Sequence, residues 1–154
     1  MNKDSERQPP QPTRSLKQYD VLVGKWTMEG THPKLPSAVL GHSSFEWLRE
    51  GALLAWHFDW EPGQGIPSAF SVIGHDDAAE PCSMLYTDER GVARIYQMSL
   101  VGSIWKMWRE STNFSQRMTS TFSDDGNTIT WHGELSHDGS TWEPDLSVTY
   151  TRNK

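Results

Sequence analysis

Regularly spaced turn residues are the feature of this sequence that most constrains its fold. From Trp26 onward, residues alternate in twos, and a turn signal interrupts the alternation roughly every ten residues. Three of these signals, DERG (88–91), DDGN (124–127) and HDGS (137–140), place Gly, Asn or Asp where the backbone angle φ must turn positive. The pattern therefore predicts many short antiparallel strands joined by hairpins.

Ten strands are predicted, at residues 25–32, 41–50, 52–61, 69–75, 83–88, 92–101, 104–111, 114–123, 128–136 and 141–152. A meander of this length either exposes two strand edges or closes on itself, and closure removes the edges. We therefore expect an all-β fold, an antiparallel up-and-down barrel of about ten strands. The segment SLKQYDVLVG predicts one short helix before the barrel, with Ser15 as N-cap and Gly24 at its end, covering one mouth.

Composition and charge restrict the classes of function. A chain of 154 residues fits a single barrel domain, placed at residues 15–154, after a polar, proline-rich tail at residues 1–14 that we expect to be disordered. The net charge of −6 argues against nucleic-acid and anionic-membrane partners, which need clustered cations. One cysteine, Cys82, and no apolar leader predict a cytoplasmic protein.

Gly24 and Trp26 open the first predicted strand, and Arg152 lies on the last. The first and last strands are neighbours in a closed barrel, so the Arg152 guanidinium can stack on the Trp26 indole. Gly24 lets the chain turn into the barrel floor, and Trp26 plugs that end. We predict that these three residues serve barrel closure.

The same residues, with the mid-chain pair Thr87-Asp88, resemble the lipocalins and the wider calycin superfamily of β-barrels. Residues 15–152 are more closely similar to a bacterial domain-of-unknown-function family of lipocalin-like barrels. The similar segments are LVGKW, FEWLREGALL, SVIGHDDAAEPCSMLYTDERG and DGSTWEPDLSVTYTR. The resemblance implies a calycin barrel. It does not imply the secreted transport typical of lipocalins, because the chain has neither a secretory signal nor a cysteine pair.

Large and charged side chains occupy both faces of several predicted strands. A dry core would not tolerate Arg94 or His57 without a partner, so these faces either meet solvent or line a cavity. We predict a non-enzymatic barrel that holds a small hydrophobic or amphipathic molecule. Arg94 and Tyr96, on one face, resemble the Arg and Tyr pairs that hold a carboxylate in fatty-acid-binding barrels.

The other predicted ligand-binding residues are His57, Arg49, Trp108 and Arg117. The arginines, Arg109 among them, fall within predicted strands, and the alternative is that they point outward as surface charges. A shift of one residue in strand register moves every side chain to the opposite face, so the sequence leaves this choice open.

Three alternatives remain at this stage. Residues i and i+2 share a strand face, so Asp59 could orient His57 as the acid–base pair of an enzyme. Haem is a second alternative, because the nitrobindins, a related calycin branch, bind haem through a histidine near the C-terminus; the last histidine here, His137, lies in a turn. Exposed Trp and Met residues could instead mediate homo-oligomers or a partner contact. No cofactor is expected, and no histidine or cysteine spacing predicts a metal site.

Overall fold

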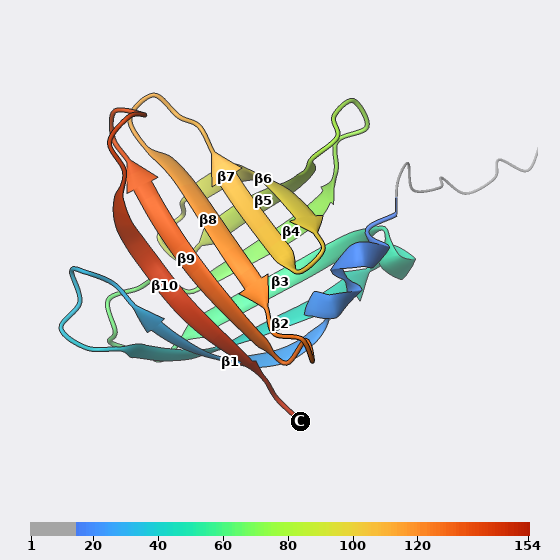
Figure 1. Ribbon diagram of the computed structural model, residues 1–154, viewed down its shortest axis with the longest axis horizontal. Coiled ribbons are helices and arrows are strands. Elements are labelled where there is room, and N and C mark those ends of the chain that lie inside the picture. Colours follow the sequence, from blue (N-terminus) through green and yellow to red (C-terminus); the bar gives the residue numbers. More distant parts are fainter. Residues whose placement is uncertain (1–14) are drawn as a thin grey trace, which may run out of the picture.

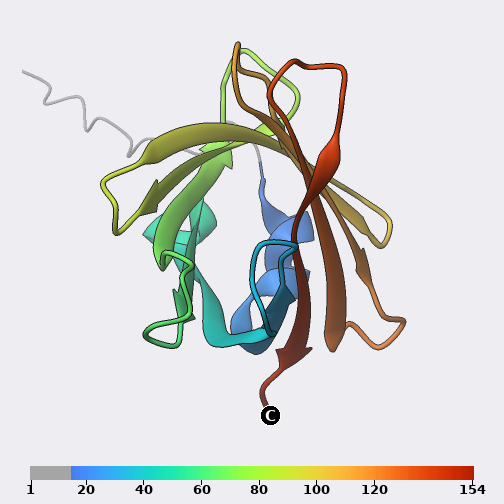
Figure 2. The ribbon, with the colours of Figure 1, turned by 90° about the vertical axis from the view of Figure 1, so that its left-hand side faces the viewer.

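The computed structural model describes residues 15–154, and the tail predicted at residues 1–14 lies outside the described residues. The strands are β1 (Gly24–Thr31), β2 (Val39–Leu48), β3 (Leu53–Trp60), β4 (Ala69–His75), β5 (Cys82–Asp88), β6 (Ala93–Val101), β7 (Ile104–Arg109), β8 (Ser115–Phe122), β9 (Thr128–Ser136) and β10 (Glu143–Arg152). Each strand pairs antiparallel with its neighbours in the sequence, and β1 also pairs with β10 (Figure 1 and Figure 2). The predicted all-β closed barrel is confirmed.

The strand boundaries lie within two residues of the predicted ones. The agreement follows from the turns, because Gly91, Gly126 and Gly139 all have positive φ and end a strand at the expected place. One boundary carries a correction. Arg49 was expected within a strand, but it lies in the 3₁₀ turn η2 (Arg49–Gly51), with a φ of 52°.

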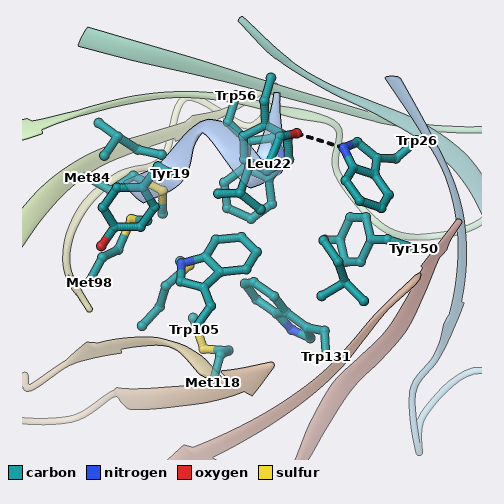
Figure 3. Close-up of a cluster of buried hydrophobic side chains, with 14 of the residues drawn as sticks. Tyr19, Leu22, Trp26, Trp56, Met84, Met98, Trp105, Met118, Trp131 and Tyr150 are labelled. Atoms are coloured by element: carbon teal, nitrogen blue, oxygen red, sulfur yellow. Dashed lines mark hydrogen bonds between the residues drawn. The ribbon is translucent and has the colours of Figure 1, made fainter. Parts of the chain in front are cut away.

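The predicted N-terminal helix is a 3₁₀ helix, η1 (Lys17–Leu22). The N-cap is Leu16 and not Ser15 as predicted, because the helix begins one residue later; the Ser15 hydroxyl still accepts the Lys17 N–H at 3.1 Å. The helix places Leu16, Tyr19 and Leu22 in the core at one end of the barrel. The Trp26 indole N–H donates to the Leu22 carbonyl at 2.8 Å, which ties η1 to β1 (Figure 3).

Arg152 lies over the Trp26 ring, with its guanidinium carbon 4.1 Å from the ring centroid, as predicted. The same guanidinium donates to the carbonyls of Val21, Val23 and Gly126, at 2.6, 2.8 and 3.2 Å. Gly24 has a φ of 127°, and a Cβ there would lie 3.1 Å from Arg152 Nη1. Glycine is required at this position for both reasons.

An aromatic cluster fills the half of the barrel next to η1. The rings of Phe45 and Trp56 stack with their centroids 4.9 Å apart. The Trp105 ring lies 5.4 Å from that of Trp56 and 5.3 Å from that of Trp131 (Figure 3). Trp105 is 1% exposed. This half of the barrel is therefore a packed core, and any internal space must lie nearer the opposite end.

The outer face carries several exposed apolar side chains on β4, β5 and β6. Val72 pairs with Leu85, and Leu85 with Ile95, so these three form one row across the strands. Leu85 and Ile95 are 46% and 55% exposed. A homo-oligomer, which the sequence left open as one alternative, stays a prediction. Among residues 15–154, no helix is long and apolar enough to cross a bilayer.

Candidate ligand-binding cavity

A cavity of about 420 Å³ occupies the end of the barrel opposite η1. Leu35 in the β1–β2 loop, Ile66 in the β3–β4 loop and Phe114 in the β7–β8 loop contribute to its rim. These loops all lie at the same end because the strands alternate in direction. The volume falls within the range of small-molecule binding sites, which is about 300–1,000 Å³.

The cavity wall consists mainly of aromatic and methionine side chains, which occupy alternate, inward positions of the strands. They are Trp56, Phe58, Trp60, Met84, Tyr86, Tyr96, Met107, Met118, Trp131 and Tyr150, and Phe114 joins them from the β7–β8 loop. Such a surface favours an apolar ligand, and rings and thioethers offer good contacts to a flat one.

Arg94 and Tyr96 both project into this cavity from β6, as the carboxylate-site prediction requires. The Arg94 guanidinium carbon lies 4.9 Å from the centroid of the Phe114 ring and 5.9 Å from that of Tyr86. No carboxylate of the described chain lies within ion-pair distance of Arg94. Burial raises the pKa of the Tyr96 hydroxyl, and the charge of Arg94 opposes that rise. Arg94 is therefore a half-buried cation with no protein counter-ion beside a neutral phenol.

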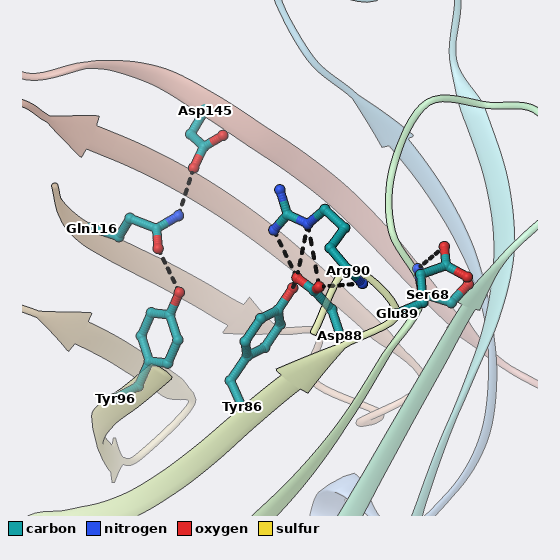
Figure 4. Close-up of polar contacts among 8 residues, drawn as sticks. All are labelled: Ser68, Tyr86, Asp88, Glu89, Arg90, Tyr96, Gln116 and Asp145. Atoms are coloured by element: carbon teal, nitrogen blue, oxygen red, sulfur yellow. Dashed lines mark hydrogen bonds and ion pairs between the residues drawn. The ribbon is translucent and has the colours of Figure 1, made fainter. Parts of the chain in front are cut away.

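A chain of hydrogen bonds leads from Tyr96 to the rim. The Tyr96 hydroxyl donates to Gln116 Oε1, and Gln116 Nε2 donates to Asp145 Oδ2 at 3.0 Å (Figure 4). Asp145 Oδ1 lies 3.1 Å from His32 Nε2, while His32 Nδ1 accepts the Lys34 N–H. The Nε2 atom of His32 must then carry the proton. The Asp145 carboxylate is thus held by Gln116 and His32, and both nitrogens of His32 are engaged.

A second polar group lies across β5 and the β5–β6 turn. Asp88 Oδ2 accepts hydrogen bonds from the Tyr86 hydroxyl and from Arg90 Nη2, both at 2.7 Å (Figure 4). The Arg90 guanidinium holds the pKa of the Asp88 carboxyl well below its usual range, and burial raises the pKa of Tyr86. Arg90 thus differs from Arg94, because its charge is already matched by a carboxylate.

His57 and Asp59 lie on the outer face of β3, because Leu54, Trp56, Phe58 and Trp60 take the inward positions. His57 Nε2 lies 3.7 Å from a carboxylate oxygen of Glu46, and its ring lies 4.7 Å from Phe70. No hydrogen bond joins His57 to Asp59 among the described residues. The two residues do not belong to the cavity, and no observation favours them as an acid–base pair.

The remaining predicted ligand-binding residues also lie outside the cavity. Arg117 forms an exposed ion pair with Glu134 at 3.2 Å and stacks on Trp142, and its neighbour Trp108 shares that outer face. Arg49 is exposed in η2, at the end of β2 that adjoins η1. Trp108 and Arg117 face outward because of the strand register. Met107 and Arg109 on β7, and Gln116 and Met118 on β8, take the inward positions on either side of them.

Sequence reasoning missed several residues of the cavity wall, namely His32, Trp60, Phe114, Gln116 and Asp145, and also Asp88, which lies outside the wall and holds the wall residue Arg90. Trp60 and Asp88 had a usable signal, because each alternates with inward residues of its own strand. Phe114 lies in a loop, where alternation gives no information. Arg109 was noted as a strand arginine only; its guanidinium carbon lies 5.9 Å from the Phe114 centroid.

No protein-family profile matches this sequence, and no curated protein matches it either. Among solved structures 16 chains match, and one is described as the crystal structure of Rv2717c from M. tuberculosis. That match has a TM-score of 0.66 at 12% identity, and it covers 95% of this chain and 100% of the other. Membership of the lipocalin or calycin family stays a prediction. At this identity the likeness supports one conclusion: the chain shares its barrel fold with a protein of known structure.

Proposed function

We propose that this protein binds a small amphipathic molecule in the barrel cavity. The apolar body of the ligand packs against the aromatic and methionine wall, and an anionic group contacts Arg94 and Tyr96. The observation that carries the proposal is the Arg94 guanidinium, which faces an apolar cavity with no carboxylate partner among the described residues.

Energetics favour a ligand anion over solvent at this position. A half-buried guanidinium loses part of its hydration, and a carboxylate on the ligand restores it through charge-assisted hydrogen bonds. The neighbouring carboxylates do not compete, because Asp88 is held by Arg90 and Asp145 by Gln116 and His32. The Tyr96 hydroxyl already donates its proton to Gln116, so Arg94 supplies the hydrogen bonds to the anion and Tyr96 only borders it.

The cavity also sets the size and shape of the ligand. About 420 Å³ accommodates a molecule of two or three rings, and the surrounding rings of Trp56, Phe58 and Trp131 offer flat contacts. A suitable probe is a biphenyl carboxylate with a para isopropyl group on its far ring, which combines a flat body with one terminal anion.

The test is calorimetric titration of this acid and of its neutral carboxamide. We expect saturable binding of the acid, and weakening by about tenfold or more in Arg94→Gln, because a hydrogen-bonded charge is lost. Arg117→Gln is the matched control, since Arg117 lies on the outer face, and it should bind like the parent protein. Equal affinity for acid and carboxamide, or no effect of Arg94→Gln, would contradict the anion site.

A further inference from the structure

Two arginines, Arg94 and Arg109, lie against the same aromatic ring at the rim of the cavity. Their guanidinium carbons are 4.9 and 5.9 Å from the centroid of the Phe114 ring. Both arginines are half-buried, and neither lies within ion-pair distance of a carboxylate in residues 15–154. We infer that the two guanidiniums form one site for a dianionic group, so that the ligand is a phosphate monoester of an apolar molecule. This inference rests on the proposed function and specifies the charge of the ligand's anion.

The pairing of β6 with β7 places Arg109 at this site. Gln97 has Trp108 as its Cα partner, so the next position of the antiparallel register sets Tyr96 opposite Arg109. Residues opposite each other share a face of the sheet, as do residues i and i+2 of one strand, so Arg94 shares this face as well. Tyr96 lines the cavity. The two arginines therefore flank Tyr96 on the inner face of the barrel.

The electrostatics at the Tyr96 hydroxyl show that this positive charge is not neutralised. Burial has the largest effect and raises the pKa of Tyr96, whereas the charges of Arg94 and Arg109 both lower it. The charge of Asp145 raises that pKa again, and its effect is smaller than that of either arginine. Positive charge therefore dominates at this edge of the cavity.

A carboxylate matches only one of the two guanidiniums. A phosphate monoester carries a charge close to −2 above its second pKa, which is about 6, and it offers three strong acceptor oxygens. Two nearby cations repel each other, and a dianion that contacts both replaces this repulsion with charge-assisted hydrogen bonds. Arg90, another arginine of the cavity wall, does not take part because Asp88 already matches its charge.

A matched pair of probes separates the charge of the anion from its shape. The probes are the phosphate and sulfate esters of one hydroxybiphenyl with a para isopropyl group on its far ring; near pH 8 the phosphate is a dianion and the sulfate a monoanion. We expect the parent protein to bind the phosphate about tenfold more tightly in calorimetric titration, because a second guanidinium is engaged. In Arg109→Gln the two esters should bind with similar affinity. Lys106→Gln removes a cation from the outer face of the same strand and should keep the tenfold preference.

A second measurement uses the parent protein alone. If the dianion binds about tenfold more tightly than the monoanion, the second pKa of the bound phosphate must fall from about 6 to about 5, which a ³¹P titration measures. Inorganic phosphate carries similar charge but has no apolar body, so it should bind at least about a hundredfold more weakly than the phosphate ester.

The outcomes distinguish this inference from the proposed function. Saturable but equal binding of the two esters, or an unchanged pKa of the bound phosphate, would overturn the dianion site and leave the proposed function standing. Inorganic phosphate that bound as tightly as the ester would overturn the apolar monoester as the ligand class. No saturable binding of either ester or of the biphenyl carboxylate would overturn both the dianion site and the proposed function.

Discussion

Ser43 holds the indole of Trp56 from a neighbouring strand: the Ser43 hydroxyl accepts the Trp56 N–H at 2.8 Å and donates to the His57 carbonyl at 2.9 Å. Ser43 is 4% exposed, and Trp56 is 2% exposed. Trp56 belongs both to the aromatic cluster and to the cavity wall. One buried hydroxyl thus fixes a ring that joins the packed half of the barrel to the hollow half.

Ser43→Ala should destabilise the fold by about 1–3 kcal/mol, because it leaves the Trp56 N–H buried and unpaired. Urea unfolding followed by tryptophan fluorescence measures this change. Ser44→Ala is the matched control, since Ser44 points to the other face of β2, and it should stay within about 0.5 kcal/mol of the parent. Equal effects of the two substitutions would show that the Ser43 hydroxyl does not hold the indole.

Arg152→Lys tests the closure of the barrel beside η1. Lysine keeps the positive charge but cannot reach three carbonyls in the planar geometry that the guanidinium of Arg152 uses. We expect a loss of about 2–3 kcal/mol, and faster amide exchange in η1, because η1 is attached to β1 and β10 through these bonds. Arg117→Lys, in an exposed ion pair, should cost less than about 1 kcal/mol. If Arg152→Lys lost no more stability than Arg117→Lys, the role of Arg152 in barrel closure would be contradicted.

Asp88 predicts a specific dependence of stability on pH. Its pKa is lowered in the folded state, chiefly by the hydrogen bonds from Arg90, so it stabilises the fold above its ordinary pKa of 3.8. That contribution is lost as the pH falls below about 4 toward the lowered pKa.

Urea unfolding at neutral pH and near pH 3 checks the dependence. Asp88→Asn should be less stable than the parent at neutral pH, and the difference should narrow in acid. Asp124→Asn, in an exposed turn, should show no such narrowing. A difference for Asp88→Asn that stays constant with pH would contradict the assignment.

The strands could be predicted from the sequence because their ends are marked by residues with a physical need for positive φ, such as Gly91 and Gly139. The strand face on which Arg94 lies could not be predicted in this way. Arg94 lies in a strand with apolar residues on its own side and on the opposite side, so alternation alone does not tell inward from outward. Arg117 shares its strand face only with Ser and Thr residues, a pattern that favours the outer face. Arg94 proved to face the cavity, and Arg117 the solvent.

The polar contacts at the cavity were beyond the reach of local patterns. His32 and Asp145 are separated by 113 residues and meet only because β1 and β10 close the barrel. The Trp60 ring likewise packs against two glycines, Gly30 and Gly41, that lie on other strands. Such relationships follow from the three-dimensional register, which one sequence does not determine.

The most direct test of a ligand inside the barrel uses methionine methyl groups as reporters. Met84, Met107 and Met118 line the cavity, whereas Met28 and Met98 are buried elsewhere and serve as internal controls. In a spectrum of ¹³C-methyl methionine protein titrated with the biphenyl carboxylate that bears a para isopropyl group, we predict saturable shifts of the three cavity methyls and little change in the other two. If the shifts failed to saturate, or if none of the three cavity methyl resonances moved, the claim that a ligand binds inside the barrel would be contradicted.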